Sequence, residues 1–234
     1  MKNILLLILS LSSINLYSQT AQNYYNQGKV KNSLKDYKGA IAVYSKAIAL
    51  NPKFDSAYYR RGNCKFSFGN IGEALDDYNK CIDIDSNFAP AYFNRGLCNI
   101  ELNNRTGALG DFNKTIELDP KLSVAYYQRG LMKYDNDDAS NAIIDYTKAI
   151  ELNPNFFNAY YNRGICKANL TLYAEAIKDF SSAIKLNPRY GEAYYQRANT
   201  KINLKDNKGA CKDYHKAAGF FYKPAFDKIK QYCN

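Results

Sequence analysis

Small and apolar residues recur along this chain with a period of 34 residues. The clearest marker is a six-residue run beginning Ala-Tyr, which occupies residues 57–62, 91–96, 125–130, 159–164 and 193–198, with a degenerate copy at 24–28. The period divides the chain, without insertions, into repeats 1 to 6: residues 17–50, 51–84, 85–118, 119–152, 153–186 and 187–220. Positions inside each repeat are numbered 1 to 34. A repeated unit of this size is typical of a stacked helical architecture.

Each repeat is predicted to contain two helices. Apolar or small residues at positions 7, 8, 12 and 14 follow the helical period in the first half. Asn, Asp or Gly residues around positions 19 and 20 interrupt that helix. The second half has Ala at position 24, Tyr or Phe at position 28 and, in five repeats, an apolar residue at position 32. This spacing of four places them on one helix face. Pro at position 2 of four repeats indicates a helix boundary.

The alternation of small and large residues predicts how the two helices pack. Gly at position 12 and Ala at position 24 allow close approach, and the ring at position 8 or 28 fills the space beside them. One such hairpin cannot bury its own apolar face, so neighbouring hairpins must stack. The sequence therefore predicts an all-α solenoid of six 34-residue helix-turn-helix repeats.

The run Ala-Tyr-Tyr-x-Arg-Gly, Ala at position 24, an aromatic ring at 28, Ala at 31 and Asn-Pro entering the next repeat resemble the tetratricopeptide repeat family. The resemblance covers residues 17–220. It implies a right-handed superhelix whose first helices line a concave groove, with proteins or extended peptides as the usual ligands. It does not imply an activity, because this scaffold serves many functions.

The resemblance also implies which positions face the groove, among them 9 and 10. Position 9 is aromatic in all six repeats, and position 10 is an amide in all but repeat 2. Side-chain amides can pair with any peptide group, and the rings offer contact area. The alternative is that the rings only pack between repeats and the amides are ordinary surface. The candidate groove residues are Tyr25, Asn26, Tyr59, Arg60, Phe93, Asn94, Tyr127, Gln128, Tyr161, Asn162, Tyr195 and Gln196.

Position 11 is Arg and position 27 is Asp in repeats 2 to 6, whereas repeat 1 lacks both. This joint presence predicts a charge-assisted pair between the two helices of each repeat. The alternative is that the Arg residues reach acidic ligands. The predicted pairs are Arg61 with Asp77, Arg95 with Asp111, Arg129 with Asp145, Arg163 with Asp179, and Arg197 with Asp213.

Residues 1–18 have the layout of a secretory signal peptide. Lys2 is followed by the apolar stretch 4–11 and then by polar and small residues ending at Ser18. The stretch is too short to remain as a membrane anchor. We therefore expect an exported protein, periplasmic or secreted, with no membrane span in the mature chain.

The tail 221–234 has apolar residues at helical spacing and is predicted to form a capping helix. Folding it back places Cys211 and Cys233 at matching heights, which makes them the favoured disulfide. The other four cysteines replace small residues on repeat positions, so we expect free thiols in the core at Cys64, Cys81, Cys98 and Cys166.

No constellation for catalysis stands out. The single histidine, His215, follows Cys211 by one helical turn, but a nucleophile and base also need an orienting group and an oxyanion site. Two ligands on one turn make a poor metal site. We expect no enzyme activity, no catalytic residue, no metal and no cofactor.

The net charge of +10 comes from lysines spread along the chain rather than from a basic run, so no nucleic-acid partner is expected. The leading hypothesis is a scaffold that holds a protein or an extended peptide in the groove. The alternatives are a structural adaptor of a cell-envelope complex and a binder of an anionic envelope polymer.

Overall fold

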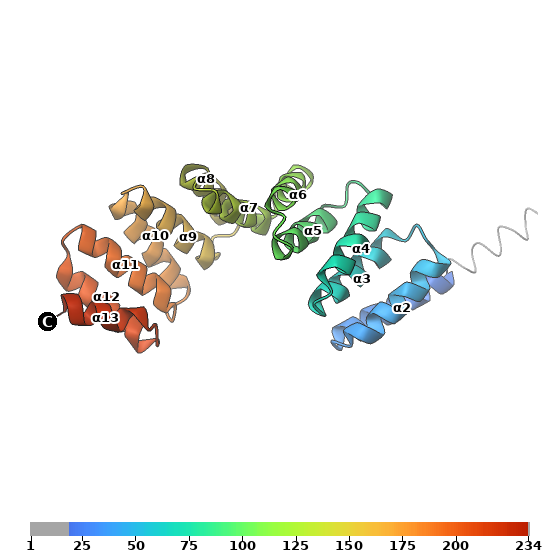
Figure 1. The fold of residues 1–234 in the computed structure, drawn as a ribbon, viewed down its shortest axis with the longest axis horizontal. Helices are drawn as coiled ribbons and strands as arrows, with labels where there is room; N and C mark the ends of the chain where they lie inside the picture. The colour runs from blue at the N-terminus through green and yellow to red at the C-terminus, as the bar shows by residue number, and fades with distance from the viewer. Residues whose placement is uncertain (1–18, 234) are drawn as a thin grey trace, which may run out of the picture. The chain divides into compact units, whose positions relative to one another are not determined.

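The computed structural model describes residues 19–233, and this part of the chain is helical with no strand. These residues divide into two compact units, one ending at Pro120 and the other beginning at Lys121. Within each unit, successive helices pack as antiparallel hairpins and each hairpin packs on the next (Figure 1). The fold is an all-α helical repeat solenoid, as the sequence pattern predicted. No helix within residues 19–233 is long and apolar enough to cross a membrane.

The N-terminal unit contains repeats 1 to 3. Residues 19–33 form the first helix of repeat 1. The remaining helices are α2 (Tyr37–Leu50), α3 (Asp55–Ser67), α4 (Ile71–Ile84), α5 (Ala89–Glu101) and α6 (Arg105–Leu118). Even-numbered labels are thus the second helices of the repeats.

The C-terminal unit contains repeats 4 to 6 and the tail. Its helices are α7 (Ser123–Asp135), α8 (Ala139–Leu152), α9 (Phe157–Asn169), α10 (Tyr173–Leu186), α11 (Gly191–Asn203), α12 (Asn207–Gly219) and α13 (Pro224–Tyr232). Helix α13 packs on α12 and buries Ala225. The tail therefore supplies a helix that covers the last hairpin, starting three residues later than the predicted segment 221–234.

The turn inside each hairpin depends on one residue in the left-handed backbone conformation at position 19. Its φ lies between 57° and 62° in five repeats and is 90° at Gly69. Asn103 and Asp137 tolerate this conformation, whereas Thr171 is β-branched and adopts it at a cost. The side chain at position 20 then caps the second helix in four repeats by accepting the backbone N–H of position 23: Asp36, Asn104, Asp138 and Asp206.

The first helices begin later than the Pro pattern suggests. Asn51, before Pro52, is the C-cap of α2, so Pro at position 2 lies in the turn after a helix and stops it. The residue at position 4 is the N-cap of the next helix, and in α3 this is Phe54, which makes no side-chain capping bond. An aromatic or Leu side chain stands at the same place before α5, α7, α9 and α11. These side chains serve packing between repeats rather than capping.

The core of each hairpin is the predicted contact between a small residue and a ring. A Cβ added at Gly62 would lie 2.8 Å from Cε1 of Tyr78, so no larger residue fits at position 12 of repeat 2. The rings at position 28 are almost fully buried, as are the alanines at position 24. The same close approach joins Gly96 with Phe112, Gly130 with Tyr146, and Gly164 with Phe180.

Candidate functional site: the first-helix face

The groove candidates at positions 9 and 10 lie on the odd-numbered helices and on residues 19–33. Together with positions 6, 13, 16 and 17 they form what we call the first-helix face. Every ring at position 9 is half-buried. The ring of Tyr127 has its centroid 4.7 Å from that of Phe156 in the next repeat and 5.8 Å from that of Tyr146 in its own repeat. Rings of Tyr25, Tyr59, Tyr161 and Tyr195 have equivalent pairs of neighbours, and Phe93 packs on Phe112. The structure therefore shows these rings packed between repeats while part of each stays accessible.

Position 10 forms a ladder with position 9 of the preceding repeat. Asn162 donates from Nδ2 to the hydroxyl of Tyr127 at 3.0 Å, and Asn94 donates to that of Tyr59 at 3.3 Å. Gln196 occupies the equivalent position beside Tyr161. In repeat 2 the exposed Arg60 takes the place of the amide beside Tyr25.

The remaining position 10 residues differ. Asn26 is exposed and accepts from Gln22 at 3.2 Å, and Gln128 is half-buried on α7.

A hollow of about 230 Å³ opens on the first-helix face of the N-terminal unit. Its lining is Asn63, Phe66, Ser67, Tyr78, Asn94 and Leu97. Asn63 Oδ1 accepts from both Asn94 Nδ2 and the Tyr78 hydroxyl, each at 2.8 Å. The polar groups around the hollow are thereby held in one arrangement, which suits it to a single side chain of a bound segment.

Burial keeps the hydroxyls of Tyr127 and Tyr161 protonated. The pKa of Tyr161 is raised to about 12, mainly by burial and then by the Tyr222 and Glu192 groups, with Gln196 opposing the rise. Burial also raises the pKa of Tyr127, against the opposing bond from Asn162. These hydroxyls therefore remain O–H donors at neutral and moderately alkaline pH.

The Arg and Asp residues at positions 11 and 27 meet in every repeat that has them. Nη2 of Arg163 lies 2.7 Å from Oδ1 of Asp179, and its Nε donates to Oδ2 at 2.9 Å. The corresponding Nη2–Oδ1 distances are 2.6 Å in repeats 2, 3 and 4 and 2.7 Å in repeat 6. These carboxylates are buried, and each guanidinium also lies 5.3–5.6 Å from the ring centroid of the Tyr at position 8. The pairs connect the two helices of a hairpin on a different face from position 9.

Two further partners of these pairs were missed from the sequence. Lys at position 15 binds the same carboxylate, as Lys133 does to Asp145 at 2.7 Å, and Asn99 replaces it in repeat 3. The free guanidinium nitrogen donates to position 29 of the repeat before, as Arg163 Nη1 does to Thr147 at 3.0 Å. The sequence contains a signal for each of these partners, because Lys at position 15 and a polar residue at position 29 recur with the 34-residue period.

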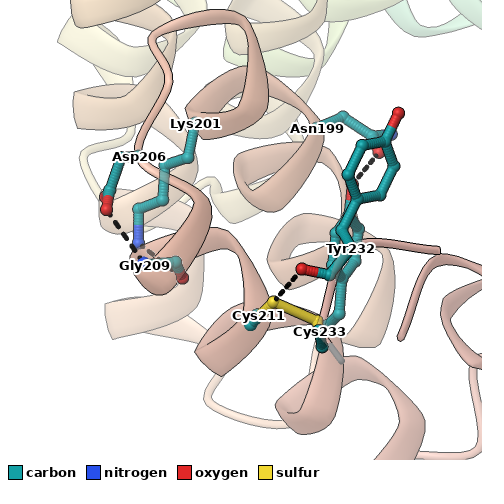
Figure 2. The surroundings of a disulfide bond; sticks show 8 residues. Asn199, Lys201, Asp206, Gly209, Cys211, Tyr232 and Cys233 are labelled. Atoms are coloured by element: carbon teal, nitrogen blue, oxygen red, sulfur yellow. Dashed lines mark hydrogen bonds between the residues drawn. A yellow bond between two sulfur atoms is a disulfide. The ribbon is translucent and has the colours of Figure 1, made fainter. Parts of the chain in front are cut away.

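The structure joins Cys211 of α12 to Cys233 after α13 by a disulfide, with Cα atoms 5.4 Å apart (Figure 2). The bond attaches the tail to the last hairpin, and the ring of Tyr232 packs 6.4 Å from that of Tyr214. Cys64, Cys81, Cys98 and Cys166 are free and buried. Burial raises the pKa of Cys64 to about 11 and that of each of the other three thiols to about 12. Such thiols are poor nucleophiles.

His215 is exposed on α12, one turn from a cysteine that is in a disulfide. Within residues 19–233, no group of three or more His, Cys, Asp or Glu side chains is arranged to hold a metal ion.

Comparison with known proteins agrees with the repeat pattern. A TPR repeat model matches residues 28–67, and tetratricopeptide repeat models match residues 56–88, 123–156 and 145–178. Together these matches span half of the chain. No curated protein matches it.

Solved structures share the fold. The crystal structure of MamA is 26% identical, with 74% of this chain and 95% of that chain covered at a TM-score of 0.66. YrrB, described as a TPR protein with an unusual peptide-binding site, is 24% identical over 80% of this chain and 97% of its own, at 0.71. PilF of Pseudomonas aeruginosa is 15% identical over 91% and 99%, at 0.78. Similarity below 25% identity shows the fold alone. The chain belongs to the tetratricopeptide repeat family, whose members are in general non-enzymatic scaffolds that bind proteins or peptides.

Proposed function

We propose that this protein is an exported, non-enzymatic scaffold that holds an extended polypeptide segment against its first-helix face. The observation that carries the proposal is the ladder between positions 9 and 10. Asn162 uses its Nδ2 on Tyr127, whereas its carbonyl oxygen has no partner within the described residues. The Tyr127 hydroxyl accepts that bond and still has its own proton to donate.

The ladder therefore offers an acceptor and a donor side by side, and a peptide group has the complementary pair. The same pairing recurs in the N-terminal unit between Asn94 and Tyr59. Fixing both side chains in advance lowers the entropy lost on binding. The adjacent rings and the hollow beside Asn63 add apolar contact for side chains of the bound segment. The peptide-binding site of YrrB, a protein of this fold, supports the same use.

The charge of the first-helix face disfavours an anionic polymer as its ligand. In the C-terminal unit, positions 6, 9, 10, 13, 16 and 17 include Asp135 and Glu192 and no Lys or Arg. In the N-terminal unit the same positions contain Lys29, Arg60 and Glu101. A polyanion needs a continuous row of cations. A neutral, polar segment fits this face better.

Binding is tested with a random peptide library displayed on phage and selected against the full-length protein. We expect selected peptides to lose about tenfold in affinity with either Asn94→Ala or Asn162→Ala, because each removes a hydrogen bond to the bound backbone and disturbs the ladder. Asn207→Ala is the matched control, since Asn207 is an exposed amide on α12, outside the first-helix face. Equal affinities for all three variants, or no selected peptide at all, would overturn the proposal.

The export half of the proposal rests on residues 1–18, which lie outside the described residues. Its test is the N-terminal sequence of the protein isolated from its source cells. A mature chain beginning at Gln19 in the extracytoplasmic fraction supports export, and an uncleaved chain in the cytoplasm contradicts it. The envelope-adaptor alternative predicts partners that bind equally well to Asn94→Ala and Asn162→Ala.

A further inference from the structure

A hollow of about 800 Å³ lies on the second helix of repeat 6, away from the first-helix face. We call it the repeat-6 hollow; it is lined by Tyr194 of α11 and by Lys212, His215, Lys216, Gly219 and Phe220 on and just after α12. Its volume lies within the range of ligand pockets. All of these residues belong to the C-terminal unit.

The hollow has an aromatic wall and a base whose charged groups are paired with one another. The rings of Tyr194 and Phe220 have centroids 5.8 Å apart. Arg197 and Asp213 also line the hollow, but Arg197 is held in an ion pair with Asp213 at 2.7 Å, and Lys201 binds the same carboxylate at 2.7 Å. The charge available to a ligand therefore comes from the exposed side chains at the rim.

Lys212 and Lys216 are exposed, one helical turn apart, and have no acidic partner within residues 19–233. This sets repeat 6 apart from other repeats. The equivalent lysine at position 30 pairs with an acid three residues on in repeats 2, 3 and 4: Lys80 with Asp83 at 3.6 Å, Lys114 with Glu117 at 2.6 Å, and Lys148 with Glu151 at 3.0 Å. In repeat 6 the position of that acid is taken by Gly219.

The corresponding hollow of repeat 2 shows the contrast. It measures about 670 Å³ and is lined by Glu73, Asp76 and Asp83 as well as by its basic residues. At the positions of these three acids, repeat 6 has Gly209, Lys212 and Gly219. The same place in the fold is thus mixed in charge in repeat 2 and purely basic at its rim in repeat 6.

We propose that the repeat-6 hollow binds an acidic polypeptide segment that also has an apolar side chain. Carboxylates of the segment pair with Lys212 and Lys216, and the apolar side chain packs against Tyr194 and Phe220. A polypeptide is favoured over a polyanionic glycan because a Leu or Phe side chain is apolar on every side and can fill a hollow lined by two rings, whereas a sugar ring offers only its C–H face. The two unpaired cations attract the acidic segment, and the apolar wall beside them fixes the orientation in which it binds.

The test introduces at position 33 of repeat 6 the acidic residue that repeats 2 to 4 have there. Gly219→Glu places a carboxylate three residues after Lys216, and a Cβ at this position meets nothing within 4 Å, so the hairpin accepts it. The control is Lys38→Gln on α2, which changes the net charge by the same amount at an exposed site in the N-terminal unit. The probes are a labelled peptide, Asp-Asp-Leu-Phe-Asp-Asp, and its counterpart with Asn in place of every Asp. Binding of both peptides is measured by fluorescence anisotropy, and binding of heparin is measured by its competition with the labelled acidic peptide.

We expect the acidic peptide to bind the full-length protein and the Asn counterpart to bind about tenfold more weakly. Gly219→Glu weakens the acidic peptide about fivefold, and Lys38→Gln leaves it unchanged. The proposal is overturned if the acidic peptide does not bind, or if it binds equally well to the wild type and to Gly219→Glu. It is also overturned if heparin competes with the peptide and Gly219→Glu lowers the affinity for heparin as much as that for the peptide. The last result would assign the surface to polyanions instead. None of these outcomes depends on the first-helix face.

Discussion

Asn162 donates a hydrogen bond of 3.0 Å to the hydroxyl of Tyr127, a residue that stands 35 positions earlier in the chain and one repeat away. The same pairing recurs between Asn94 and Tyr59. It connects neighbouring repeats through the surface on which we propose that the ligand lies. A contact that orders the repeats also orders the binding face, so the stability of this face and its affinity for ligand are coupled.

The buried carboxylate of Asp145 is predicted to be essential for the stability of repeat 4. It is 1% exposed and accepts from Arg129 at 2.6 Å and from Lys133 at 2.7 Å. Asp145→Asn leaves two partly buried cations without their counter-charge, and we expect a loss of about 3 kcal/mol in the free energy of unfolding. Urea denaturation followed by circular dichroism measures it.

Asp111→Asn provides the comparison for that change. Repeat 3 has the neutral Asn99 where repeat 4 has Lys133, so only one cation, Arg95, loses its partner. The loss should be clearly smaller than for Asp145→Asn. An unchanged unfolding midpoint for Asp145→Asn would show that the pair has no structural role and would revive the interpretation that the Arg residues serve acidic ligands.

Tyr146→Phe is predicted to stabilise the protein. The Tyr146 hydroxyl is buried and has no hydrogen-bond partner within the described residues. The equivalent hydroxyls of Tyr78 and Tyr214 donate to Asn63 and Asn199 at position 13. Position 13 of repeat 4 is Leu131, which cannot accept. Removing the unsatisfied hydroxyl should raise the free energy of unfolding by about 1 kcal/mol.

Tyr78→Phe is the matched variant, because it removes the same atom where that atom is satisfied. It should leave stability unchanged or lower it by about 1 kcal/mol. The two variants are compared in the same urea titration. Destabilisation by Tyr146→Phe equal to that by Tyr78→Phe would mean that the Tyr146 hydroxyl has a partner after all.

Thiol counting checks the cysteine assignments. The native protein, unreduced, should react very slowly with a thiol reagent because its four free thiols are buried and have raised pKa values. Unfolding without reductant should expose those four, and reduction should add Cys211 and Cys233. Six reactive thiols in the unfolded, unreduced protein would contradict the disulfide.

Alkaline pH is predicted to destabilise the fold. Burial raises the pKa of Cys81, Cys98 and Cys166 from 9.0 to about 12, so the unfolded chain releases these protons before the folded chain does. The corresponding stability is fully present below pH 9 and is lost as pH rises through the folded pKa values. Each thiol should contribute a loss of about 1 kcal/mol between pH 9 and pH 10.

The variant with Cys81, Cys98 and Cys166 all changed to Ala provides the control for this pH dependence. Ala already occupies position 31, that of Cys81, in repeats 1, 4, 5 and 6. The free energy of unfolding of this variant should vary less between pH 9 and pH 10 than that of the wild type. Parallel profiles would show that the thiols do not set the alkaline limit.

The packing within the repeats could be predicted from the sequence, because each residue that packs in the core recurs at the same position in several repeats. The contact of Gly62 with Tyr78 follows from that pattern. The pattern also predicted a helix boundary at Pro52, but not that Phe54 is the N-cap of the next helix, because an aromatic N-cap contradicts capping preferences and is explained by the ring of Tyr25 on the neighbouring helix. The ladder could not be predicted either, because it joins position 10 of one repeat to position 9 of the preceding repeat and so depends on how the two repeats stack.

The central claim is that a polypeptide lies on the first-helix face, and site-specific photo-crosslinking tests it most directly. A benzophenone amino acid replaces Ser67, which is exposed and lines the hollow beside Asn63, or Thr106, which is exposed on the second helix α6. Both sites belong to the N-terminal unit, so the comparison is between two faces of one unit. We predict that a peptide selected by the full-length protein becomes crosslinked from position 67 and not from position 106. Crosslinking from position 106 alone would contradict the account.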